Sequence, residues 1–154
     1  MSSLELKIPP PVVLFACAIL AWGIARIVPG PALLPAGLRV GIALALALPG
    51  MGLGIGGVLA FRRAGTTISP HAPAATRAVV RAGPYRFTRN PMYLGLACLL
   101  TGVCAWLGHP TALLAVVVFV AYITRFQIRP EERALEEKFG DSFRTYRNAV
   151  RRWL

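Results

Sequence analysis

Residues 81–95 read RAGPYRFTRNPMYLG, and here a basic segment rich in turn residues changes into a long apolar run. No residue from Asn90 to Thr124 carries a formal charge. As a single helix this run would be about 52 Å long, whereas the hydrocarbon core of a bilayer is about 30 Å thick. The run is therefore predicted to cross a membrane, turn, and cross it again.

Gly108-His109-Pro110 supplies the expected turn, because Gly and Pro are the strongest sequence signals for a break in a helix. The run then divides into predicted spans at 92–108 and 111–128, which form a helical hairpin. Two earlier apolar runs predict spans at 12–28 and 40–61. The glycines and the Pro-Gly pair of the second run indicate a kinked helix that packs closely.

The composition agrees with an integral-membrane protein of one domain. The 154 residues are 56% hydrophobic and 15% charged, with a mean hydropathy of +0.60. Most of the 17 basic residues lie in the predicted loop at 62–90 or beyond residue 124. The positive-inside rule then places this loop and both termini in the cytoplasm, at a bacterial inner membrane, with lipids rather than nucleic acid as expected partners.

The tail at 130–154 is predicted to be an amphipathic helix on the cytoplasmic membrane surface, with a break at Gly140-Asp141. Its apolar residues recur every three or four positions: Leu135, Phe139, Phe143, Tyr146, Val150 and Trp153. The predicted fold is thus an all-α membrane protein. It has about four transmembrane helices, the last two forming a C-terminal hairpin pair, and an amphipathic C-terminal helix.

The cysteines and histidines do not indicate a metal site. Cys17, Cys98 and Cys104 lie within apolar runs, which is typical of packing residues. His71 and His109 have no Cys, Asp or Glu at a spacing suited to a shared ion. No metal is therefore expected.

Polar residues gather at the start of the predicted hairpin. Asn90 is a favoured N-cap and Pro91 a favoured first helical residue, with Arg86 and Arg89 just before them. The free N–H groups and positive dipole end of such a helix start suit a carboxylate or phosphate. The alternative is that Asn90-Pro91 only cap a span which the arginines orient.

Glu131 and Glu132 follow the end of the predicted hairpin. A carboxylate pair at a membrane surface suits a cation or sugar hydroxyls, although acids after Pro130 also compensate a helix dipole. Because a hairpin returns to the membrane face from which it starts, its two ends are expected to lie side by side. An anion site that faces two carboxylates suits a zwitterionic ligand with hydroxyl groups, such as S-adenosylmethionine.

Two motifs in this order also resemble a known family. They are GPYRFTRNPMYLG at 83–95 and PEERALEEKFGDSFRTY at 130–146, followed by a closing VRRW. This pattern is similar to the integral-membrane methyltransferases grouped as isoprenylcysteine carboxyl methyltransferases and phospholipid methyltransferases. The resemblance covers about residues 65–154, including a Thr66-Thr67-x-x-Pro70 approach to the first motif.

The resemblance implies methyl transfer from S-adenosylmethionine, with S-adenosylhomocysteine as product, to a lipophilic or amphiphilic acceptor such as a lipid. The implied cofactor-binding residues are Gly83, Pro84, Tyr85, Arg89, Asn90, Pro91, Met92, Tyr93, Gly95, Glu131 and Glu132. Many relatives have Arg-His-Pro where this chain has Arg89-Asn90-Pro91, so the acceptor and the atom methylated are left open. Of the candidate catalytic residues, Arg129 suits a carboxylate acceptor and Glu132 an amine acceptor.

Other classes of protein remain as alternatives. A small four-span transporter driven by protons needs an acidic residue within the membrane, and none of the predicted spans contains Asp or Glu. A membrane reductase that uses a nicotinamide cofactor needs a larger phosphate-binding apparatus than one turn supplies. The non-catalytic alternatives are a membrane assembly protein and a family member that binds the cofactor-like ligand without turnover.

Overall fold

The computed structural model describes residues 5–28, 32–65 and 78–154, and within these ranges it contains helices and no β-strand. Its elements are α1 (Pro10–Ile27), α2 (Ala36–Arg63), the 3₁₀ turn η2 (Gly83–Arg86), α3 (Pro91–Leu107), the 3₁₀ turn η3 (Pro110–Leu113), α4 (Leu114–Ile123), the π-helical turn η4 (Thr124–Ile128), α5 (Arg129–Phe139) and α6 (Asp141–Ala149). The all-α prediction is confirmed. Thr66-Thr67, Pro70 and His71 lie outside the described residues.

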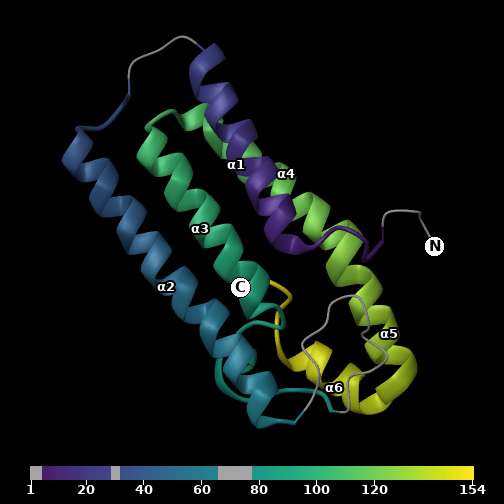
Figure 1. Ribbon diagram of the computed structural model, residues 1–154. Coiled ribbons are helices and arrows are strands. Elements are labelled where there is room, and N and C mark those ends of the chain that lie inside the picture. Colours follow the sequence, from purple (N-terminus) through teal and green to yellow (C-terminus); the bar gives the residue numbers. More distant parts are fainter. Residues whose placement is uncertain (1–4, 29–31, 66–77) are drawn as a thin grey trace.

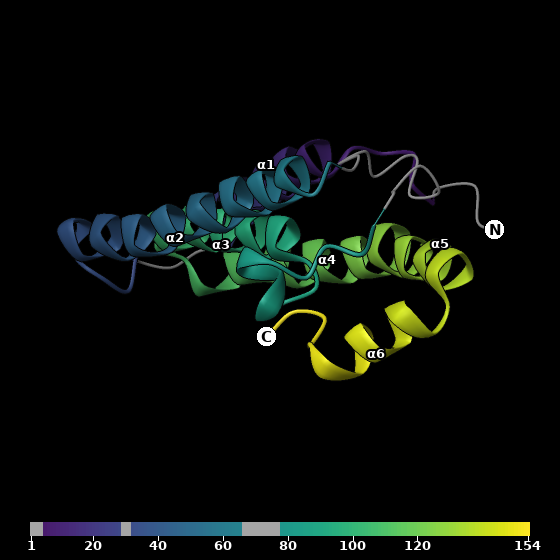
Figure 2. The ribbon, with the colours of Figure 1, turned by 90° about the horizontal axis from the view of Figure 1, so that it is seen from below.

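The apolar helices α1 to α4 lie side by side, with α5 and α6 at one end of the bundle (Figure 1). Among the described residues, α1, α2 and the continuous helix Pro110–Phe139 are long and apolar enough to cross a membrane, and α3 is a shorter apolar helix. The prediction of about four transmembrane helices is therefore confirmed. Figure 2 shows α6 lying to one side of the four apolar helices.

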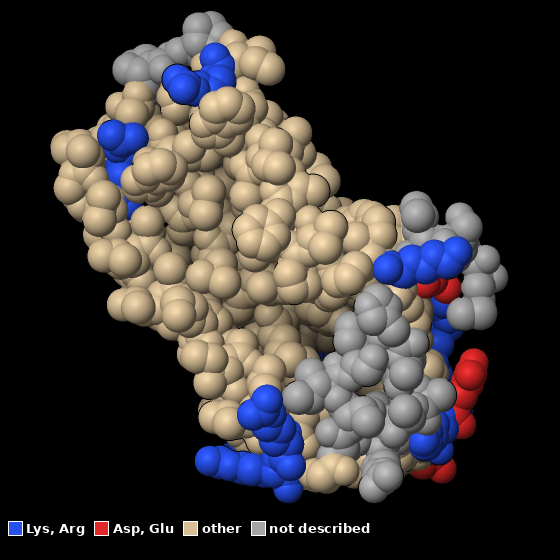
Figure 3. Space-filling view, viewed as in Figure 1, with Lys and Arg blue, Asp and Glu red and all other residues tan. Residues whose placement is uncertain are grey.

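Large apolar side chains cover the outside of the bundle. Phe15, Ile27, Leu48 and Val117, for example, are between 63% and 81% exposed. Figure 3 shows that charged side chains gather at the two ends of this face and leave an uncharged belt between them. Such a surface suits lipid hydrocarbon, where apolar groups cost nothing and unpaired polar groups cost several kcal/mol.

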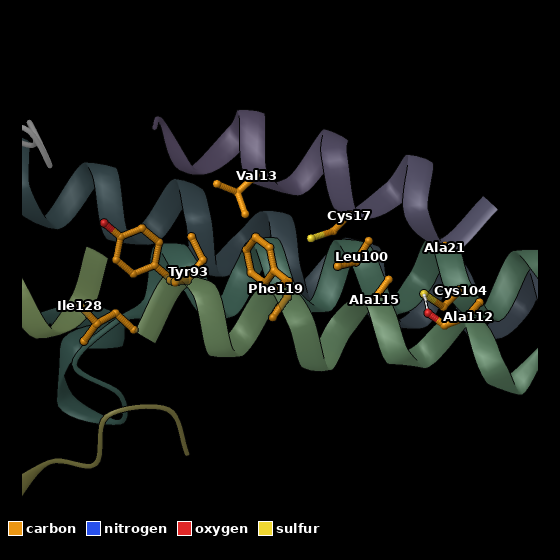
Figure 4. Close-up of a cluster of buried hydrophobic side chains, with 12 residues drawn as sticks. Val13, Cys17, Ala21, Tyr93, Leu100, Cys104, Ala112, Ala115, Phe119 and Ile128 are labelled. Atoms are coloured by element: carbon orange, nitrogen blue, oxygen red, sulfur yellow. Dashed lines mark hydrogen bonds between the residues drawn. The ribbon is translucent and has the colours of Figure 1, made fainter. Parts of the chain in front are cut away.

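One apolar core joins α1, α3 and α4 (Figure 4). Val13 and Cys17 of α1 face Leu100 of α3 and Phe119 of α4, and the last two are completely buried. Cys17 and Cys104 are free and buried in this core, in agreement with their prediction as packing residues.

The hairpin turns where it was predicted to turn. Gly108 ends α3 with a φ of 78°, a left-handed conformation that glycine adopts at little cost. Arg39 of α2 donates from Nη1 to the carbonyl oxygens of Trp106 (3.1 Å) and Leu107 (3.3 Å). These bonds satisfy carbonyls that the end of a helix leaves without an intrahelical partner.

The chain stays helical from Pro110 to Phe139, so no break separates the last apolar segment from the polar tail. Pro130 has no N–H group and would ordinarily interrupt a helix, and the wider π turn η4 lies at the point where that hydrogen bond is lost. The helix ends instead before Gly140, which has a φ of 50°, and α6 begins at Asp141. The break predicted at Gly140-Asp141 is thus present.

Glycines let α2 and α3 pack backbone against backbone. A Cβ on Gly50 would lie 2.8 Å from the carbonyl oxygen of Gly95, and a Cβ on Gly95 would collide with the carbonyl oxygen of Gly50. A Cβ on Gly102 would lie 3.0 Å from the carbonyl oxygen of Ala43. The close packing expected of the second apolar run is therefore present, and it fixes the position of α3.

Replacing Gly95 with alanine is expected to destabilise the fold by about 2 kcal/mol, because the new Cβ forces the backbones of α2 and α3 apart. Gly52→Ala is the matched control, since a Cβ on Gly52 meets no atom within 4 Å. That change should be neutral or slightly stabilising in a helix. Unfolding in detergent, followed by circular dichroism, measures both variants, and equal stabilities would contradict the close contact.

Candidate active site

A cavity of about 430 Å³ lies at the end of the bundle that carries α5 and α6. The described residues that line it are Pro10, Pro11, Gly54, Val58, Phe61, Ala78, Val79, Val80, Tyr85, Arg89, Asn90, Met92, Tyr93, Leu96, Glu131, Glu132, Leu135, Phe143 and Tyr146. Most are apolar, and a few polar groups come from the start of α3 and the start of α5. This size and composition are typical of a small-molecule site.

Glu131 is the carboxylate of the cavity with which no arginine of the described segments forms an ion pair. It lies in the first turn of α5, beyond the apolar part of that helix, and its Oε1 accepts a hydrogen bond from Tyr93 Oη at 2.5 Å. Burial, opposed by this bond and assisted by the charge of Glu132, raises the pKa of Glu131 to about 7. A bound cation would favour its charged form.

Glu132 is held between two arginines. Its Oε1 lies 2.9 Å from Arg89 Nη2 and its Oε2 lies 2.6 Å from Arg152 Nη2, while its side chain is 12% exposed. Arg89 also donates from Nη1 to the carbonyl oxygens of Arg147 (2.6 Å) and Val150 (3.1 Å). Glu132 therefore joins α5 to the turn before α3 and to the C-terminal segment.

Asn90 occupies the N-cap position of α3, but its side chain makes no capping hydrogen bond. It donates instead from Nδ2 to the carbonyl oxygen of Arg152, at 2.9 Å. The backbone N–H of Arg89 bonds to the carbonyl of Arg151 at 2.9 Å, and Trp153 Nε1 donates to Thr124 Oγ1 at 3.3 Å. The last residues of the chain thus run along the turn before α3.

The N-terminus of α3 opens onto the cavity, where Met92 and Tyr93 are lining residues. The first N–H groups of a helix have no intrahelical acceptor and carry the positive end of its dipole. The cavity therefore combines the start of α3, where the helix dipole favours an anionic group, with the carboxylate of Glu131, whose charge favours a cationic group.

The other predicted site residues do not line this cavity. They are Gly83, Pro84, Pro91, Gly95 and Arg129. Pro84 and Pro91 pack beside Gly56 and Gly57 of α2, so they hold the turn and the start of α3 in place. Arg129 is exposed on α5.

Some walls of the cavity were not identified from the sequence as site residues. Phe143 and Tyr146 belong to the apolar series of the tail, whose helix was expected to face lipid, and here they are buried against the protein. Tyr146 Oη donates to the carbonyl oxygen of Tyr85 at 2.8 Å. Burial raises the pKa of Tyr146 to about 12, so its phenol stays neutral and can donate. Nothing in the pattern around Pro10-Pro11 signals a cavity wall.

Comparison with known proteins found one matching family and a similar protein. The model of a protein family described as phospholipid methyltransferase matches residues 38–142, more than half of the chain. An uncharacterized protein of Haemophilus influenzae is 49% identical over 63 residues, which are 41% of this chain and the whole length of that relative. Both motifs of the site fall within or overlap the residues matched by the family.

Replacing Glu132 with glutamine is expected to lower the free energy of unfolding by about 3 kcal/mol, because Arg89 then stays buried without a counter-ion. Glu136→Gln is the control: Glu136 also pairs with two arginines, but its side chain is 29% exposed, so the loss should be under about 1 kcal/mol. Denaturant titration in detergent compares the two. An equal loss would show that Glu132 is not a structural link.

Proposed function

We propose that this chain, which belongs to the phospholipid methyltransferase family, transfers a methyl group from S-adenosylmethionine to a lipophilic or amphiphilic acceptor at a membrane surface. One observation carries the proposal: a single cavity is lined both by the N-terminus of α3 and by Glu131, which no described arginine neutralises. A ligand with both an anionic and a cationic group fits this pair. The family supports methyl transfer, and the cofactor is our inference.

The residues of the cavity fit the cofactor. The start of α3, at Met92 and Tyr93, would hold its carboxylate, and Glu131 would hold its positive charge. The apolar walls, including Phe61 and Leu135, suit the rest of the molecule and exclude water. When bound, the cofactor supplies a methyl group already activated on a positively charged sulfur.

An amine acceptor fits this cavity better than a carboxylate acceptor. Arg89, the arginine that lines it among the described residues, is engaged by Glu132 and by two backbone carbonyls. Arg129, the cation first considered for a carboxylate, is exposed and outside the cavity. Glu131 therefore replaces Glu132 as the carboxylate that faces the bound ligands, and its negative charge favours an amine acceptor over a carboxylate acceptor.

The protein contributes to the reaction by holding the reactants in position and by excluding water. Holding the acceptor close to the methyl group makes the step effectively unimolecular, and this alone can lower a barrier by about 7–11 kcal/mol. Tyr93 fixes Glu131 through its 2.5 Å hydrogen bond. Glu132, with Arg89 and Arg152, fixes the two helix starts relative to each other.

A lipid acceptor would enter from the bilayer along the outer face of α2 and α3. A groove of about 390 Å³ runs along these helices and shares Gly54, Val58, Met92 and Leu96 with the cavity. Met51, Ile55 and Leu59 beside it are between 41% and 56% exposed on the outer face of α2. We place this end of the molecule on the cytoplasmic side of a bacterial inner membrane, since most of the basic residues gather there.

Binding of S-adenosylmethionine to the purified protein tests the cofactor. Calorimetry at pH 8 should show binding by the wild type and at least about tenfold weaker binding by Glu131→Gln, because a hydrogen bond to a charged group contributes about 1.5–3 kcal/mol. Binding by the wild type should weaken as the pH falls from 8 to 6, since Glu131 becomes protonated below its pKa of about 7. The glutamine variant should lack this part of the pH dependence.

Two results would reverse this conclusion. Absence of binding of either S-adenosylmethionine or S-adenosylhomocysteine to the wild type would favour the transporter or assembly protein considered above. Unchanged binding by Glu131→Gln and by Asn90→Ala would place the cofactor elsewhere.

Ile55→Trp tests entry from the bilayer. Ile55 lines the groove and not the cavity, and it is 56% exposed, so a larger side chain there can fill the groove and leave the cavity open. Transfer to an acceptor with acyl chains should fall about tenfold or more, while transfer to a short-chain amine and cofactor binding should persist. Leu48→Trp is the matched control, because Leu48 is 63% exposed on the same helix and lines neither space. If the wild type uses water-soluble acceptors and ignores lipids, lateral entry is wrong.

A further inference from the structure

Residues 5–9, directly before α1, cross the junction between α4 and α5. Glu5 forms ion pairs with Arg125 Nη1 at 3.2 Å and with Arg133 Nη2 at 2.7 Å, and its side chain is only 4% exposed. Arg125 belongs to the π turn η4 and Arg133 to α5. One nearly buried carboxylate therefore connects the two sides of Pro130.

Backbone contacts strengthen the same connection. The N–H of Leu6 donates to the carbonyl oxygen of Phe126 at 3.0 Å. In a regular α-helix that carbonyl would accept from residue 130, where proline has no N–H to offer. Gln127 Nε2 also donates to the carbonyl oxygen of Ile8, at 2.7 Å. The N-terminal segment thus supplies bonds to a helix junction whose own hydrogen-bond ladder is incomplete.

The conformation of this segment indicates that the contacts are specific. Leu6 has a φ of 59°, in the left-handed region that residues with a side chain rarely adopt. Such a conformation persists only where surrounding contacts over-determine it. Here it accompanies the N–H bond of Leu6 to Phe126 and the burial of the Glu5 carboxylate.

This segment adjoins two parts of the candidate active site. Glu131, which follows Pro130 directly, lines the cavity and bonds to Tyr93. Pro10 and Pro11, which follow the segment, line the same cavity. The segment therefore holds both one cavity wall and the helix turn that carries the carboxylate.

We propose that Glu5 is a positioning residue of the methyl-transfer site. By pairing with Arg125 and Arg133 across Pro130, Glu5 fixes the start of α5 and so holds Glu131 against Tyr93. Glu5 itself does not line the cavity, so its effect on ligands passes through Glu131. The effect on the cofactor rests on the proposed function, whereas the clamp across Pro130 is a property of the fold alone.

Glu5→Gln removes the charge and keeps the shape of the side chain. Calorimetric titration should show S-adenosylmethionine binding about tenfold more weakly with an unchanged stoichiometry, since misplacement by about 1 Å can cost up to about 10²-fold in function. Unchanged stoichiometry separates misplacement of Glu131 from partial unfolding, which lowers the number of sites. The matched control is Glu137→Gln: Glu137 is an exposed acid of α5 that forms no ion pair within the described segments, and the change should leave binding as in the wild type.

A double variant tests the route of the effect. If Glu5 acts through Glu131, adding Glu5→Gln to Glu131→Gln should weaken binding no further, because coupled residues are not additive. Full additivity, or unchanged binding by Glu5→Gln alone, overturns the positioning role.

Hydrogen exchange without cofactor tests the clamp independently of the proposed function. Amides from 126 to 133 should exchange faster in Glu5→Gln than in the wild type or in Glu137→Gln, and equal exchange overturns the clamp. Failure of the wild type to bind the cofactor would refute the proposed function and the role in binding, while the exchange result still decides whether Glu5 holds the junction.

Discussion

The buried ion pair between Arg89 and Glu132 is the interaction on which the arrangement of the site depends. It joins the turn before α3 to the first turn of α5, and Arg152 extends it to the C-terminal segment. Breaking one partner of such a pair costs much more than the pair itself contributes, because the remaining charge stays buried. Three segments far apart in the sequence are therefore held in one geometry by one carboxylate.

In this geometry the neighbouring acids Glu131 and Glu132 have different roles. Glu132 is neutralised by arginines and serves the fold, whereas Glu131 meets a tyrosine and faces the cavity. The sequence pattern treats the two acids alike, since both begin a helix after an apolar segment. Their difference comes from tertiary contacts, because the partners of Glu132 are remote in the sequence and carry no local signal.

Much of the fold could be predicted because a bilayer restricts the choices. Uncharged runs that cross the bilayer must be helices long enough to span its hydrocarbon core, and Gly108 and Gly140 mark where two of the helices end. The two site motifs could also be placed together by the hairpin. The bonds of Asn90 and Leu6 could not be predicted, since both use backbone carbonyls, which every residue offers equally. The cavity wall at Pro10-Pro11 depends on how α1 packs, which periodicity does not record.

The π turn η4 sets the direction in which the side chains of α5 point around the helix axis. A π turn holds about one residue more than an α-helical turn, so it rotates later side chains by about 100° around the helix axis. Ile123, directly before η4, and Ile128, the last residue of η4, are five positions apart and are both completely buried in the core. The face that α5 presents to the cavity is therefore chosen at residues 124–128, where the apolar part of the helix ends. Helix geometry at the end of the apolar segment thus decides which charged residues of α5 face the cavity and which face solvent.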